Sequence, residues 1–193
     1  LPATTLADGC YQYMFSGCGL ISAPELPATT LTPLCYYGMF EECYNLTSAP
    51  KLSATALAKS CYCNMFRLCT RLTSAPELPA TTLAEYCYDS MFWGCTSLNS
   101  VPQLPATTLA NGCYGGMFAR CTNLTSAPEL PATTLVDYCY NAMFWGCSKL
   151  SSVTMLATNI SATDCLLDWM DGVASSGTFT KAASMESLPS GSS

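Results

Sequence analysis

The chain has 193 residues, of which half are apolar and only 10% are charged, and its net charge at pH 7 is −6. With seven basic residues and no basic cluster it lacks the surface that neutralises nucleic-acid phosphates. The absence of histidine excludes a Ser-His-Asp triad, and no run of eighteen apolar residues predicts a membrane-spanning helix.

An internal repeat of about 26 residues organises the chain. The dipeptide Cys-Tyr recurs in each unit, and Met-Phe follows it four positions later. The first spacing between units is 25 residues and the next four are 26. The dipeptides begin at Cys10, Cys35, Cys61, Cys87, Cys113 and Cys139. A fixed period in this range predicts a solenoid, in which each unit buries its apolar face against the next.

The first half of each unit predicts a short helix. In the fourth unit Leu83, Cys87, Met91 and Cys95 recur at every fourth position, which indicates one apolar stripe along a helix. A threonine precedes the stripe as a possible N-cap, and Gly94 near its end is typical of a helix stop.

The second half predicts a short extended segment, because residues 98–105 are too few and too rich in proline for a helix. A proline recurs at one place in successive units, so every coil would lack the same backbone donor. These prolines are Pro24, Pro50, Pro76, Pro102 and Pro128. We therefore expect strands of about three to five residues, followed by a turn.

The order of these residues resembles the BspA-like, or Treponema-type, branch of the leucine-rich-repeat family. The matching positions of one unit are Leu98, Val101, Leu104, Pro105, Leu109, Cys113, Met117, Phe118 and Cys121. The resemblance covers Leu1 to about Trp169, although the unit is longer than the family's and Cys-Tyr stands where the family has Ile-Gly. It implies an α/β repeat solenoid, a leucine-rich-repeat horseshoe with short parallel strands on one face and short helices on the other.

The repeat divides the chain into three parts. Residues 1–151 hold six leucine-rich repeats, and residues 152–171 form a degenerate repeat that we expect to cap the stack. Residues 172–193 are a tail or linker rich in Ser, Gly and Thr, with a possible strand at 178–180. Because the chain begins inside a repeat unit, we expect it to be part of a longer protein.

Fourteen cysteines allow disulfides, metal binding or buried free thiols. Twelve of them form six C-x7-C pairs, and the only close pair, Cys61 with Cys63, occurs once, so no metal site is expected. Within a helix the pair spacing would separate the two Cα atoms by about 12 Å, too far for a bridge. A bridge between adjacent coils stays open, but we favour free buried thiols.

Residues that vary within the repeated frame are the candidates for binding. The two positions after Met-Phe vary among the units, and they include tryptophan and arginine, which often dominate the energy of an interface. The candidate contacts are Trp93, Trp145, Arg67 and Arg120. No recurring carboxylate pair suggests acid/base catalysis, so we expect no enzyme, cofactor or catalytic residue.

The resemblance implies an extracellular protein-binding or adhesion module of a bacterial cell-surface protein, whose partner is a host or bacterial surface protein. From the charge and the lack of a long apolar run, we expect no nucleic acid to bind and no membrane insertion. Two alternatives remain, a structural spacer or stalk that presents another domain, and a component of a phage or appendage.

Overall fold

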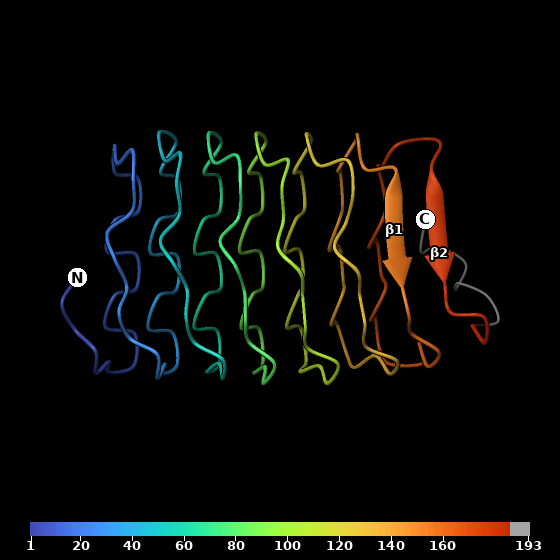
Figure 1. Ribbon diagram of the computed structural model, residues 1–193, viewed down its shortest axis with the longest axis horizontal. Coiled ribbons are helices and arrows are strands. Elements are labelled where there is room, and N and C mark those ends of the chain that lie inside the picture. The colour runs from blue at the N-terminus through green and yellow to red at the C-terminus, as the bar shows by residue number, and fades with distance from the viewer. Residues whose placement is uncertain (186–193) are drawn as a thin grey trace.

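The computed structural model describes residues 1–185. The chain is a solenoid in which similar coils stack in a row from the N-terminal end to the C-terminal end (Figure 1). The predicted strand–helix architecture is wrong, because residues 1–185 contain no helix and only two strands. These are β1 (Ser152–Met155) and β2 (Thr178–Lys181), which pair in parallel.

The absence of helices from residues 1–185 also makes the predicted leucine-rich-repeat architecture wrong. A horseshoe of that family needs helices on one face, and in the described residues turns occupy that half of every coil. The expectations of adhesion and secretion drawn from that architecture therefore have no support in the fold.

The segment that was predicted to be a helix is a ribbon of overlapping turns. The amide of Cys87 donates to the carbonyl of Ala84 over 3.2 Å, and such i to i−3 bonds recur at every second residue through the segment. Every fourth residue has a positive φ, as at Tyr86 (55°), Ser90 (52°) and Gly94 (73°). A positive φ at the third position is typical of a type II turn and interrupts any helix.

The other amides of the ribbon bond to the next coil. The amide of Tyr88 donates to the carbonyl of Cys113 over 3.0 Å, and that of Phe92 to the carbonyl of Met117 over 2.9 Å. Donors within the coil and donors to the next coil therefore alternate along the chain. Through residues 86–95 this alternation gives every amide an acceptor. A helix would satisfy its amides within one segment, whereas this ribbon needs the next coil.

The ribbon also explains the misleading stripe. Buried residues come as adjacent pairs, with Cys87 and Tyr88 followed by Met91 and Phe92, each at most 1% exposed. A helix would bury residues at spacings of both three and four, whereas Ser90, three residues after Cys87, is half-buried. Pairs of adjacent buried residues that recur every four positions therefore indicate turns and not a helix.

Aromatic and sulfur columns fill the core. Rings of adjacent coils stack in parallel, as for Tyr88 on Tyr114 at 5.7 Å between centroids and Phe92 on Phe118 at 5.7 Å. All fourteen cysteines are free thiols, and twelve of them are buried as we favoured, whereas Cys10 and Cys18 are exposed. The second cysteine of a pair donates its thiol hydrogen to a phenylalanine carbonyl of the preceding coil. Thiol donors and their S···O distances are Cys43 (3.0 Å), Cys69 (3.1 Å), Cys95 (3.1 Å), Cys121 (3.2 Å) and Cys147 (2.9 Å).

Proline shortens the extended segments further than expected. The sequence predicts strands of three to five residues, but among residues 1–185 the coils that carry the recurring proline show only isolated parallel bridges such as Ser74 with Ser100. The two four-residue strands, β1 and β2, lack this proline. The possible strand at 178–180 is confirmed as part of β2. Ser152 pairs with Thr178, one repeat further along, so the last coil reaches beyond residue 171.

The C-terminal end of the stack is closed by larger side chains. Trp169 is fully buried at the place of the usual methionine, and its ring meets Phe179 edge-on at 5.8 Å. Met185 is also buried. In the first coil, by contrast, Cys10, Met14 and Cys18 are exposed. The part of the predicted tail at 186–193 lies outside the described residues.

Candidate interaction surface

A single column of side chains runs along the turn ribbons. Its positions are the residues after Met-Phe, which neighbouring coils place one above another because each coil repeats the same turns. From the second coil to the seventh the column contains Glu41, Arg67, Trp93, Arg120, Trp145 and Asp171. We call these six residues the ladder.

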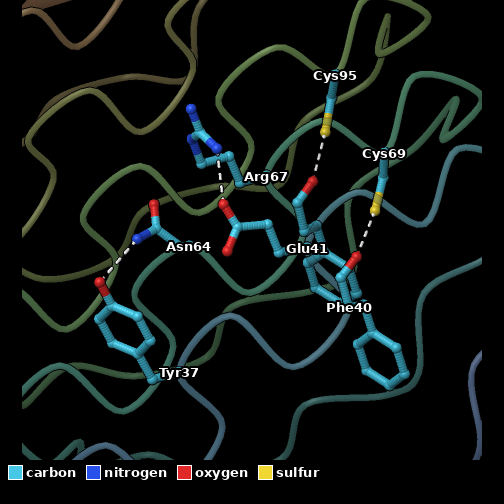
Figure 2. A network of polar contacts seen from close by, with 8 residues as sticks. Tyr37, Phe40, Glu41, Asn64, Arg67, Cys69 and Cys95 are labelled. Atoms are coloured by element: carbon cyan, nitrogen blue, oxygen red, sulfur yellow. Dashed lines mark hydrogen bonds and ion pairs between the residues drawn. The ribbon is translucent and has the colours of Figure 1, made fainter. Parts of the chain in front are cut away.

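The N-terminal part of the ladder is an ion pair followed by a cation–π contact. Nη1 of Arg67 lies 2.6 Å from Oε1 of Glu41, and the two side chains are 31% and 14% exposed (Figure 2). The Arg67 guanidinium also lies 4.5 Å from the centroid of Trp93. Partial burial favours both contacts because water competes less there.

The C-terminal part continues in the same way. The guanidinium of Arg120 lies 5.2 Å from the Trp93 ring centroid and 4.7 Å from that of Trp145. Trp145 then donates its indole N–H to Oδ2 of Asp171 over 3.2 Å. The six residues therefore form one continuous chain of contacts across six coils.

The local sequence makes room for this arrangement. Arg120 occupies the second position after Met-Phe, with φ at 59°, and Ala119 is buried at the position where the neighbouring coils carry tryptophan. Gly146 in the next coil lies beneath Arg120, and a β-carbon there would come 3.4 Å from Cγ of that arginine. A small residue next to a large one thus lets the arginine reach between two indoles.

All four residues predicted from the sequence belong to the ladder and contact one another through it. Whether they bind a partner stays a prediction. The sequence analysis missed Glu41 and Asp171, although both occupy the first position after the Met-Phe place in their coils. Comparing the charges down that one column could have found them.

Further polar contacts, outside the ladder, join the residues that follow Cys-Tyr in adjacent coils. Nδ2 of Asn64 donates to the hydroxyl of Tyr37 over 3.0 Å (Figure 2), and the Cys63 thiol lies 3.7 Å from Oδ1 of Asp89. Burial raises the pKa of Asp89 to about 6, although bonds from Ser90 and Cys63 oppose the shift. Burial also raises the pKa of the Cys63 thiol well above its usual value, so this thiol is not a nucleophile.

A cavity of about 190 Å³ opens at the C-terminal end. Its lining includes Leu150, Val153, Met170 and Phe179, together with Ser176. Ser176 stands one repeat after Leu150, at a place where four earlier coils also bury a leucine. The cavity therefore follows from a missing core side chain and contains no group suited to catalysis.

Among residues 1–185 no three potential metal ligands gather into a cluster. The same residues include no helix that could cross a membrane. No family model matches the chain, and neither does any curated protein or solved structure. The family resemblance accordingly rests on the sequence pattern alone.

Proposed function

We propose that this chain is a protein-binding module of a bacterial cell-surface protein and that the ladder is part of its contact surface. The observation that carries the proposal is the ladder itself, in which two tryptophans and two arginines form one partly exposed line. These residue types contribute most of the energy of many interfaces. A stacked solenoid holds them in place before a partner arrives, which lowers the entropy cost of binding.

The extracellular location belongs to the same proposal. Cysteines in an oxidising compartment usually form disulfides, but the core thiols of this chain are buried. Burial raises the pKa of Cys35 to about 11 and that of Cys87 to about 12, so both stay protonated and unreactive at neutral pH. An oxidising environment is therefore compatible with free thiols in this core.

The alternative is a structural spacer. The ladder residues satisfy one another, with Glu41 against Arg67 at one end and Asp171 against Trp145 at the other. Such a chain of contacts ties six coils together and stiffens the stack without any partner. This alternative predicts that the ladder contributes to stability alone.

Site-specific photo-crosslinking in the native host distinguishes the two. One photoreactive residue replaces Thr122, whose amide bonds to the Arg120 carbonyl, and a second replaces the exposed Gln103 in the proline-containing half of its coil as a control. The binding proposal predicts a discrete protein adduct from position 122 alone, lost in a Trp93→Ala, Trp145→Ala variant that remains folded. Equal labelling from both positions, or an adduct that survives this variant, contradicts it.

A further inference from the structure

Arg120 differs from the other cation of the ladder in what surrounds it. Arg67 has a carboxylate partner at 2.6 Å, in Glu41. Within residues 1–185 the ion pairs are Arg67 with Glu41 and Lys59 with Glu85, so Arg120 contacts indole rings but no carboxylate. Its side chain is exposed. The ladder therefore contains one guanidinium whose charge no acidic group balances.

The two rings that contact this guanidinium come from the coils before and after that of Arg120. Its carbon Cζ lies 5.2 Å from the centroid of Trp93 and 4.7 Å from that of Trp145. Arginine carries five N–H donors in one plane, and a carboxylate accepts two of them side by side. A guanidinium held between two rings has lost much of its rotamer freedom already, so binding an anion costs less entropy.

We infer that Arg120, held between Trp93 and Trp145, is a receptor for a carboxylate in an acidic, partly apolar segment of a partner protein. The inference rests on the proposed function and names the chemistry of its partner. The arginine supplies the bidentate contact, and the two indoles supply apolar surface for the side chains that flank the acid.

The surrounding charges favour a single carboxylate over a polyanion. Asp171 lies at the end of the ladder next to Trp145, and Glu41 lies at the other end. The chain as a whole carries a net charge of −6. Both features repel a nucleic acid or a sulfated polymer, whereas a short segment with one acid between apolar residues meets the cation without meeting these carboxylates.

Intrinsic tryptophan fluorescence measures this binding directly, because Trp93 and Trp145 flank the site while Trp169 is buried in the cap. The probe is an acetylated and amidated Leu-Asp-Leu peptide, and its matched control has Asn in place of Asp. We expect the Asp peptide to bind at least about tenfold more tightly than the Asn peptide, since only the former pairs with the fork. Equal binding of both peptides, or equal quenching by inorganic phosphate, overturns the inference.

The variant Arg120→Lys keeps the charge and removes the planar fork. We expect it to weaken binding of the Asp peptide about tenfold, while Arg71→Lys, at an exposed arginine outside the ladder, leaves binding unchanged. Thermal unfolding of each variant shows that it is folded. Unchanged affinity in folded Arg120→Lys refutes the site.

The two proposals fail in different ways. A crosslinked partner at position 122 whose binding is insensitive to Arg120→Lys refutes the carboxylate site and leaves the protein-binding function intact. Conversely, an Asp peptide that needs Arg120, with no ladder-specific partner in the host, supports the site and refutes the proposed function.

Discussion

The ring of Tyr86 lies over the backbone of Gly112 in the next coil, so closely that a β-carbon on Gly112 would come within 2.3 Å of it. Leu68 lies over Gly94 in the same manner, with a distance of 2.6 Å. At these two places a large side chain at a position of positive φ extends over the following coil, and the glycine there leaves room for it. A larger residue in place of either glycine would meet that side chain, so these pairs favour the observed order of the coils.

The variant Gly112→Ala tests this relationship. We expect a loss of about 1–3 kcal/mol in the free energy of unfolding, because the new methyl group meets Tyr86 and because φ at this glycine is +60°. In a Tyr86→Ala background the steric part should vanish and leave about 1 kcal/mol of backbone strain. Chemical denaturation measures both values. As a control, Gly19→Ala, with open space around its Cα, should be close to neutral, and an equal loss in both backgrounds contradicts the contact.

The repeat allowed the stacked architecture and the effect of proline to be predicted. Successive copies of one unit must bury the same face. The recurring proline removes the same donor from successive coils, which pair there only through isolated bridges such as Ser74 with Ser100. The sequence could not exclude a helix, because Cys87, Met91 and Cys95 would be buried in a helix and are also buried in the observed turn ribbon. What distinguishes the turn ribbon from a helix is the backbone at Ser90, where φ is 52° and the amide donates to the carbonyl of Gly115 in the next coil.

The candidate surface, too, could be predicted only in part from the sequence. Equivalent positions in a repeat must come together, so Trp93 and Trp145 could be assigned to one line from their sequence spacing. The insertion of Arg120 between their rings could not, because it depends on the turn geometry and on the space above Gly146. Which side chains of a column contact one another depends on packing between coils, and the sequence period does not reveal that packing.

Thiol reactivity provides a second prediction. Ellman's reagent should modify two thiols in the native protein, Cys10 and Cys18 of the exposed first coil, and all fourteen after denaturation. The remaining twelve are buried, and burial raises the pKa of thiols such as Cys35 and Cys87, which slows their reaction. The double variant Cys10→Ser, Cys18→Ser should show no fast reaction. A count below fourteen in the denatured, unreduced protein would demonstrate disulfides between coils.

The buried carboxyl of Asp89 predicts a pH-dependent stability. Burial raises its pKa to about 6, so the folded state holds this proton more tightly than the unfolded chain, whose aspartates titrate near pH 4. Its contribution to stability is therefore complete below about pH 4 and is lost as the pH rises through about 6, a change on the order of 2 kcal/mol. We expect Asp89→Asn to be more stable than the wild type at pH 8 and to lose this advantage at pH 4.

Urea denaturation of both proteins at a series of pH values measures that difference. The comparison cancels the other titrating groups, which the two proteins share. Asp8→Asn, at an exposed position in the first coil, serves as the control for the change of side chain. A difference between Asp89→Asn and the wild type that stays constant with pH would mean that the Asp89 carboxyl is solvated in the folded protein.

The cavity at the C-terminal end predicts a stabilising substitution. Ser176 lines this space of about 190 Å³ and stands where leucine is buried in the coil before it. Ser176→Leu should place its side chain against Leu150 and Phe179 and bury apolar surface that the serine leaves uncovered. Partial filling of this kind contributes about 1 kcal/mol, or an increase in Tm of about 2–4 °C for a chain of this size. Thr180→Leu adds the same side chain at an exposed position outside the cavity and should give no such increase, so equal effects of the two substitutions would show that filling the cavity is not the cause.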